Sequence, residues 1–237
     1  MKAIALQAIH QPNGGILGHE VLVRQSVGGS WVGPGAFMAG SNPQAWVSMD
    51  RAVAQMLINH AADLRGRGVS FVNVSAHTLA DPAELYAVCR SLAKLTQMGV
   101  EVCVEVSEAF DAIGSSFNQA MGVIKDQGLL LAIDDFGIEW SNFSRLSSYP
   151  WDYCKVDLTA VWNSDNLDWL IEVRDYCSAN GIGLILEKLE CLKVLGGLLK
   201  PLNSASVQGF ALSKPFILQI NSFADCSATQ QKAQQSL

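Results

Sequence analysis

From residue 69 onward the sequence alternates short apolar runs with amphipathic helical segments, and this order constrains the fold more than any other feature. The apolar runs are "VSFVNVS", "VEVCVEVS", "LLLAIDD", "YCKVD", "IGLILE" and "ASVQGF". Alternation of strands and helices predicts a parallel sheet with right-handed crossovers. Two earlier strands bring the count to eight, which is enough to close a barrel. An open doubly wound sheet is the structural alternative, although no glycine-rich fingerprint follows an early strand.

The first two strands predict a departure from a regular barrel. Only "HQPNGG" separates "KAIALQAI" from "ILGHEVLVR", and its Asn13-Gly14 pair is a hairpin signal. No helix fits between these strands, so they should run antiparallel. The predicted fold class is therefore α/β, a modified (β/α)8 TIM-type barrel with an antiparallel first strand.

Composition predicts one folded domain at residues 1–223, followed by a polar tail at residues 224–237. Hydrophobic residues make up 49% of the chain and charged residues 16%, which indicates a large core. The net charge of −6 argues against a nucleic acid polymer as partner. The six cysteines form no CxxC pair, and neither a signal peptide nor a membrane-spanning run is visible. These features predict a cytoplasmic protein that does not bind membranes.

Polar residues recur near the ends of the predicted strands. From residue 73 onward they are separated by 32, 29, 21, 32 and 21 residues, each about one strand–helix unit. Each alone has a structural explanation as a helix cap. In a barrel, however, the C-terminal strand ends meet on one face, where several carboxylates repel one another unless a cation compensates them. Carboxylate and amide oxygens suit Mg²⁺, Mn²⁺ or Ca²⁺ better than zinc. The residues in question are Glu20, Asn73, Glu105, Asp134, Asp135, Lys155, Glu187 and Gln208.

Lys155 favours catalysis over metal storage. It shares a strand face with Asp157, so a structural ion pair between these two residues is one explanation. The other is that Lys155 holds a metal-bound water. Two adjacent carboxylates that can serve two metals, together with a lysine, suit in-line attack of a metal-bound hydroxide on a phosphodiester.

These segments resemble the motifs of the EAL domain family. "GHEVLVR" is similar to the signature that names the family, here as Glu20-Val21-Leu22. "FVNVSAHTL" and "VEVSE" resemble its VNLS and E-I-T-E segments. "AIDDFG", "CKVD", "LEKLE" and "VQGF…SKPF" resemble its DDFG, K-I-D, E-G-V-E and QG-Y…KP motifs. All occur in family order from about Gln7 to Phe216, so the resemblance covers nearly the whole chain.

The resemblance implies a stand-alone phosphodiesterase barrel that hydrolyses the small molecule cyclic di-GMP to linear pGpG. It implies that the cofactor is Mg²⁺ or Mn²⁺ and that two ions bind. It also implies that the chain can form a homodimer. Carried over by motif, the first ion would be bound by Glu20, Asn73, Glu105 and Asp134, and the second would be served by Asp135.

The same motifs imply catalytic and binding roles. Lys155 would hold the attacking water, Glu187 would act as general base, and Glu190 would support Glu187. Arg24 would contact a substrate phosphate, and Gln208 would position the metal–water cluster or substrate. Glu108 would brace the loop that follows Asp135.

Five positions depart from the family pattern, of which Val21 for Ala and Phe210 for Tyr keep the apolar character. Ile138 and Glu139 replace a small residue and a glycine after "DDFG", and Lys188 replaces a glycine directly after Glu187. A rival function is therefore a barrel without turnover that acts as a cyclic di-GMP receptor or protein-binding regulator. Hydrolysis of another phosphodiester, such as a linear dinucleotide, is a third reading of the same metal site.

Overall fold

The computed structural model describes residues 1–107, 109–111, 114–137, 143–192, 202 and 204–218. Glu108, Ile138, Glu139 and the predicted tail from residue 224 lie outside these ranges. Within them, every helix is too short or too polar to cross a membrane. The described cysteines are all free thiols: Cys89, Cys103, Cys154 and Cys177 are buried, and Cys191 is exposed.

Eight strands close into a barrel, which confirms the predicted fold class. Around the barrel the order is β1-β9-β8-β7-β6-β5-β4-β2, and pairing of β1 with β2 completes the circle. Strand β1 is antiparallel to both of its barrel neighbours, whereas the other neighbouring pairs are parallel. The barrel strands are β1 (Lys2–His10), β2 (Ile16–Val27), β4 (Val69–Val74), β5 (Val102–Val106), β6 (Leu130–Phe136), β7 (Tyr153–Asp157), β8 (Gly183–Glu187) and β9 (Ser206–Val207).

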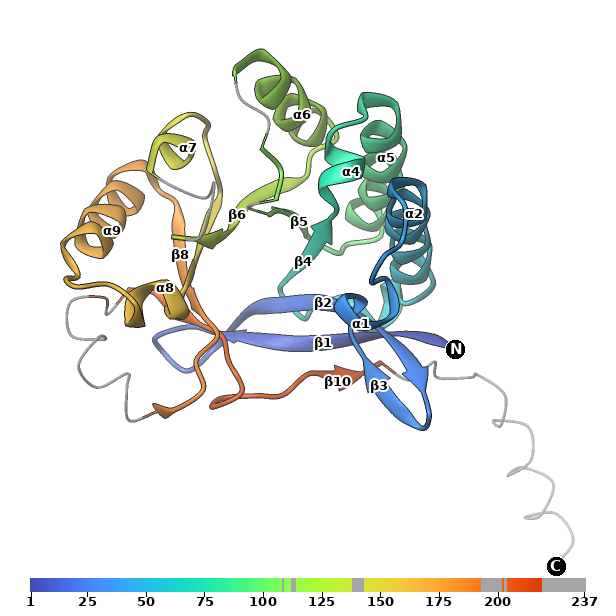
Figure 1. Cartoon of the computed structure of the whole chain (residues 1–237), viewed down its shortest axis with the longest axis horizontal. Helices are drawn as coiled ribbons and strands as arrows, with labels where there is room; N and C mark the ends of the chain where they lie inside the picture. Colours follow the sequence, from blue (N-terminus) through green and yellow to red (C-terminus); the bar gives the residue numbers. More distant parts are fainter. Residues whose placement is uncertain (108, 112–113, 138–142, 193–201, 203, 219–237) are drawn as a thin grey trace, which may run out of the picture.

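Two short strands that the sequence did not indicate extend this sheet. β3 (Ser30–Val32) pairs with β2, and β10 (Phe216–Ile217) pairs with β1, both antiparallel. In Figure 1, β1 and β2 lie side by side, with β3 and β10 next to them on the side away from the larger helices.

Helices surround the remaining strands. Figure 1 shows α2, α5, α6, α7 and α9 in an arc around β4 to β8. Side-chain caps begin the two longest described helices: Asn42 accepts a hydrogen bond from Ala45 N, and Asp81 accepts from Ala83 N and Glu84 N. The described helices are α1 (Pro34–Phe37), α2 (Pro43–Asn59), α3 (Ala61–Leu64), α4 (Ala76–Leu79), α5 (Pro82–Gln97), α6 (Gly114–Asp126), α7 (Phe143–Ser147), α8 (Leu158–Trp162) and α9 (Asp168–Asn180).

The predicted Asn13-Gly14 turn joins β1 to β2. Gly14 has a φ of 84°, a conformation that glycine adopts without strain. Gln11 N donates to Gly15 O over 2.8 Å and closes the turn. The resulting register places Gln7 opposite Glu20, so the hairpin brings Glu20 to the barrel mouth.

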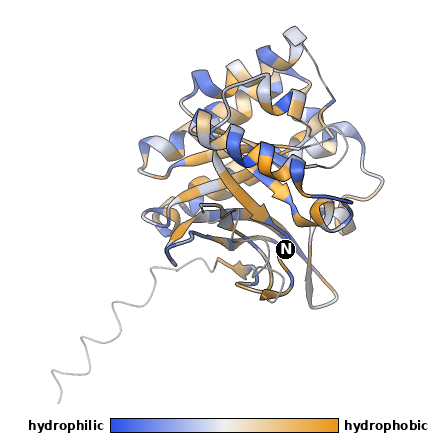
Figure 2. Ribbon diagram, turned by 90° about the vertical axis from the view of Figure 1, so that its left-hand side faces the viewer, coloured by the Kyte–Doolittle hydropathy of each residue, from blue (hydrophilic) through white to orange (hydrophobic). Residues whose placement is uncertain are grey.

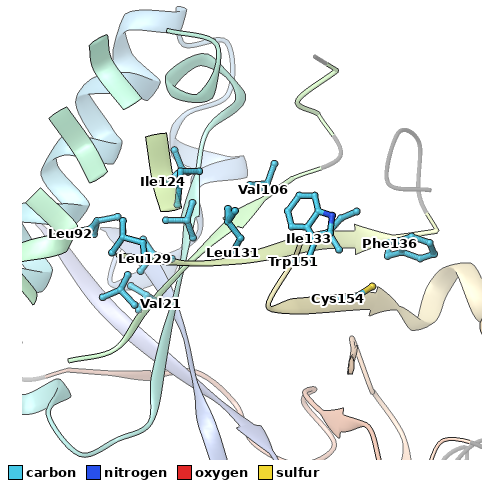
Figure 3. Close-up of a cluster of buried hydrophobic side chains, with 14 of the residues drawn as sticks. Val21, Leu92, Val106, Ile124, Leu129, Leu131, Ile133, Phe136, Trp151 and Cys154 are labelled. Atoms are coloured by element: carbon cyan, nitrogen blue, oxygen red, sulfur yellow. The ribbon is translucent and has the colours of Figure 1, made fainter. Parts of the chain in front are cut away.

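The main hydrophobic core lies between the strands and the helices. Leu131 and Ile133 of β6 alternate with residues that face the barrel interior. They face outward and pack toward helix residues such as Leu92 and Ile124 (Figure 3). Figure 2 shows the same division, since apolar colour dominates the central strands while the helices carry both apolar and polar positions. This packing fixes the strands that carry the polar residues.

Asp50 ties helix α2 to the segment that follows Asn73. Its Oδ2 accepts hydrogen bonds from Ser75 N (3.0 Å), Ser75 Oγ (2.6 Å) and Thr78 Oγ1 (2.6 Å), and Asp50 is buried. Burial raises the pKa of Asp50, although these hydrogen bonds oppose the rise. The carboxylate therefore satisfies three donors at the beginning of α4.

We expect Asp50→Ala to lower the free energy of unfolding by about 2–3 kcal/mol, because it leaves buried donors without an acceptor. Urea denaturation followed by circular dichroism measures this loss. Ser48→Ala, on an exposed position of the same helix, serves as control and should change stability by less than about 0.5 kcal/mol. Equal losses in the two variants would contradict the role given to Asp50.

Candidate active site at the barrel mouth

The strand alternation builds the site in two layers. An inner hydrophobic cluster fills the lower barrel with Ile9, Val69, Phe71, Cys103, Ala132 and Ile185. Two residues further along each of five strands, a polar side chain faces the same interior because side chains alternate along a strand. The five pairs are Phe71 and Asn73, Cys103 and Glu105, Ala132 and Asp134, Tyr153 and Lys155, and Ile185 and Glu187. The predicted polar residues thus form a layer directly above an apolar one.

Lys155 lies at the centre of this polar layer. Its Nζ is 2.6 Å from Glu105 Oε1, 2.6 Å from Asp134 Oδ1 and 3.0 Å from Glu187 Oε2, and only 1% of its side chain is exposed. Burial alone would lower the pKa of Lys155, but the three carboxylates raise it well above its usual value. The lysine is therefore held as an ammonium. It does not use Asp157 for this, although the sequence left that pairing open.

The three carboxylates around Lys155 experience opposing effects. Burial raises the pKa of Glu105 and Glu187 well above the usual range and also raises that of Asp134, while Lys155 works against the rise in each. Further carboxylates nearby add to the rise. Additional positive charge in this layer would stabilise the ionised forms.

A second group of hydrogen bonds connects the two sides of the mouth. Asn73 Nδ2 donates to Glu20 Oε1 over 3.0 Å and to Glu105 Oε2 over 2.7 Å. Gln208 Nε2 donates to Glu20 Oε2 over 2.5 Å and to Gln7 Oε1 over 3.4 Å. These contacts bring β2, β4, β5 and the end of β9 together around Glu20.

Asp135 reaches the mouth through an irregular strand end. Neighbouring residues of a regular strand face opposite sides, so Asp134 and Asp135 should diverge. The register between β6 and β7 shifts between Ile133 and Phe136, and Asp135 has a φ of 49°. Asp135 Oδ1 accepts a hydrogen bond from Lys188 Nζ over 2.6 Å.

Two ammonium groups therefore compensate the adjacent aspartates in the described structure. Lys155 contacts Asp134, and Lys188 contacts Asp135. Lys188 also lies 2.7 Å from Asp157 Oδ2. In the sequence Lys188 is recognisable only as a departure from the family pattern, and its two aspartate partners were not predicted because they lie 53 and 31 residues away.

The site opens into a cavity of about 830 Å³, within the range of pockets that bind small molecules. Arg24 and Glu190 lie on its wall, and Arg24 Nη1 donates to Val23 O over 3.0 Å. Two exposed aromatic residues, Trp162 and Phe210, also line it, and the sequence analysis assigned neither of them to the site. Predicted residues on the wall are Glu20, Arg24, Asn73, Asp134, Asp135, Lys155, Glu187, Glu190 and Gln208, with Glu105 buried behind them.

The donor set fits a hard divalent cation. Glu20 and Glu105 accept hydrogen bonds from the Asn73 amide, and Lys155 links Glu105 to Asp134. Carboxylate and amide oxygens of this kind are the ligands that Mg²⁺ and Mn²⁺ prefer. Glu187 Oε1 and Gln208 Oε1 are buried and accept no hydrogen bond from the described residues. In the side-chain positions described, no three His, Cys, Asp or Glu residues already form a ligand cluster, since Lys155 and Asn73 occupy the contacts between them. Ion binding therefore requires these carboxylates, and the Asn73 amide oxygen, to turn toward a common point.

Known proteins share this chain's sequence pattern and fold. The family described as EAL domain matches residues 3–215. Uncharacterized proteins of Mycobacterium tuberculosis and Mycobacterium bovis are 26% identical over 229 residues, which is 91% of this chain and 36% of each relative. The chain thus spans about a third of the length of these curated relatives.

Solved structures show the same barrel. An EAL domain protein from Listeria monocytogenes has 21% identity and a TM-score of 0.75, covering 91% of this chain and 88% of that one. Bacillus subtilis YkuI, in complex with its substrate c-di-GMP and calcium, has 21% identity and a TM-score of 0.79, covering 92% and 56%. Klebsiella pneumoniae BlrP1, in a manganese and cyclic di-GMP complex, has 26% identity and a TM-score of 0.76, covering 91% and 56%.

Proposed function

This chain belongs to the EAL domain family, and from that premise we propose that it is a phosphodiesterase that hydrolyses cyclic di-GMP to linear pGpG. One observation carries the proposal. Five carboxylates, two side-chain amides and a buried lysine lie at or directly behind one cavity on the barrel mouth: Glu20, Glu105, Asp134, Asp135, Glu187, Asn73, Gln208 and Lys155. BlrP1, a relative of the same fold with manganese and cyclic di-GMP bound, supports the choice of ligand and of a divalent cofactor.

We assign the cofactor Mg²⁺ or Mn²⁺ to the set Glu20, Asn73, Glu105 and Asp134. Such an ion supplies Lewis acidity toward the phosphodiester and lowers the pKa of a water molecule. The family pattern adds a second ion at Asp135, where this chain places Lys188.

The chain's own residues would carry the proton and hold the substrate. Glu187 has a raised pKa, and its Oε1 accepts no hydrogen bond from the part of the chain that the structure describes, so it is suited to accept the proton of the attacking water. Lys155 Nζ would hold that water while it fixes Glu187 Oε2.

Three further residues at the mouth would support the reaction. Glu190 would support Glu187, and Arg24 would bind a substrate phosphate from the cavity wall. Gln208 would hold Glu20 in position. The predicted support from Glu108 lies outside the described residues.

A receptor or regulator without turnover is the second candidate. The Lys188 contacts favour it, because a lysine that bridges Asp135 and Asp157 alters the part of the site next to the proposed base, Glu187. For either candidate we also propose that residues 1–223 form the barrel, that the chain forms a homodimer, and that the protein is cytoplasmic. Free thiols at all described cysteines are typical of a reducing compartment.

Turnover distinguishes the two candidates. Purified protein is incubated with cyclic di-GMP and Mg²⁺, Mn²⁺ or excess EDTA, and the products are separated by chromatography. We expect linear pGpG with either ion and at least a 100-fold lower rate in EDTA, since the reaction depends on the ion. Binding of cyclic di-GMP without pGpG would favour the receptor. Neither binding nor turnover would contradict both the enzyme and the receptor and would leave a barrel that acts through protein partners.

A further inference from the structure

Lys188 and Asp135 share an uncommon backbone conformation. Among the described residues other than glycine, only these two have a positive φ, 60° for Lys188 and 49° for Asp135. Residues with a side chain rarely adopt this left-handed region, because Cβ approaches the following carbonyl oxygen. The two strained residues bind each other, Lys188 Nζ to Asp135 Oδ1, over 2.6 Å. The strain is therefore located at both ends of one ion pair.

Asp157 completes the environment of the Lys188 ammonium. Its Oδ2 lies 2.7 Å from Lys188 Nζ, and its Oδ1 accepts a hydrogen bond from Thr159 N over 2.6 Å. The latter bond caps α8 and fixes the carboxylate. The aspartates come from β6 and β7 and the lysine follows β8, so three consecutive strands meet at this ammonium.

Two carboxylates held in this way are also suitable ligands for a second divalent ion. Mg²⁺ or Ca²⁺ would lie about 2.0–2.6 Å from their oxygens, which is the space that the ammonium takes. Two cations cannot share these oxygens at such distances without strong repulsion. A covalently attached lysine competes at a high effective concentration whatever the free metal concentration.

We propose that Lys188 takes the place of a second divalent cation, so that this chain binds one ion at its mouth. The inference rests on the proposed function, in which Glu20, Asn73, Glu105 and Asp134 hold the first ion. A glycine at position 188, as in the motif that "LEKLE" resembles, would leave the space between Asp135 and Asp157 open.

Counting bound Mn²⁺ tests the inference. Equilibrium dialysis with elemental analysis gives ions per chain for the wild type, Lys188→Gly and Lys188→Arg, at free Mn²⁺ about tenfold above the first dissociation constant. Electron paramagnetic resonance on the same samples shows whether the ions are coupled, as expected for two ions about 3.5–4 Å apart. Lys188→Gln removes the charge while keeping a long side chain, and circular dichroism verifies that each variant is folded.

We expect one uncoupled ion in the wild type and in the charge-preserving Lys188→Arg, and a coupled pair in Lys188→Gly and Lys188→Gln. A coupled pair in the wild type would overturn the inference and leave the proposed function intact. A single ion in both neutral variants would overturn it as well. Absence of any bound ion in all four proteins would overturn the ion site of the proposed function itself.

Discussion

Replacing Lys155 with methionine should destabilise the metal-free protein by about 3–5 kcal/mol near neutral pH. The substitution removes the ammonium that contacts Glu105, Asp134 and Glu187, all of which are buried. Because methionine fills a similar volume, the loss of stability would come from the uncompensated carboxylate charges and not from a cavity. Urea denaturation in EDTA, followed by circular dichroism, measures the difference. Under the proposed function, turnover should be lost as well.

The destabilisation caused by Lys155→Met should increase with pH. Burial already raises the pKa of Glu105 and Glu187, and removal of the ammonium raises it further. A carboxyl whose native-state pKa is raised favours the native state at low pH, and this stabilisation is lost as pH rises through the native-state pKa. The loss should therefore be smaller near about pH 5.5 than near about pH 8.

Lys125→Met is the matched control for this prediction. Lys125 Nζ lies 2.7 Å from Asp152 Oδ2, but the two side chains are 32% and 27% exposed. Loss of a partly exposed pair should cost about 0–1 kcal/mol and vary less with pH. An equal loss in the two variants would show that Lys155 does not stabilise the buried carboxylates as described.

The barrel could be predicted because its strands are short, apolar and separated by helical segments. The hairpin at Asn13-Gly14 gave the direction of the first strand, and the structure confirms it. β3 and β10 escaped prediction because three-residue and two-residue strands carry too little periodicity. Their pairing depends on the position of a sheet edge, which local sequence does not encode.

The positions of the site residues could be predicted, but their partners could not. Alternation along parallel strands places Asn73, Glu105 and Glu187 at the mouth from sequence alone. Which carboxylates contact Lys155 depends on the strand order and closure of the barrel. The positive φ of Asp135 and of Lys188 depends on a local register shift and on an ion pair between distant segments. The sequence therefore suggested metal ions as compensation for the two aspartates, whereas the described contacts are with two lysines.

Glu187→Gln should lower the turnover of cyclic di-GMP by about 10²–10⁴-fold with little change in KM, because it removes the proposed general base but keeps the shape of the side chain. Burial raises the pKa of Glu187, and the negative charges of Asp134 and Asp135 raise it further. Removing the charge of Glu187 should leave the free energy of unfolding unchanged or slightly higher. Initial rates and urea denaturation measured on the same preparation separate an effect on chemistry from an effect on folding.

Glu172→Gln is the control for this last prediction, since Glu172 is an exposed carboxylate on α9, away from the residues that line the cavity. It removes the same charge and should leave both rate and stability unchanged. If Glu187→Gln kept more than about a tenth of the wild-type rate, proton transfer by Glu187 would account for too little of the catalysis to be the base. If the rate fell together with stability, Glu187 would act by holding Lys155 in place, because the Lys155 contact is the one that a neutral amide weakens.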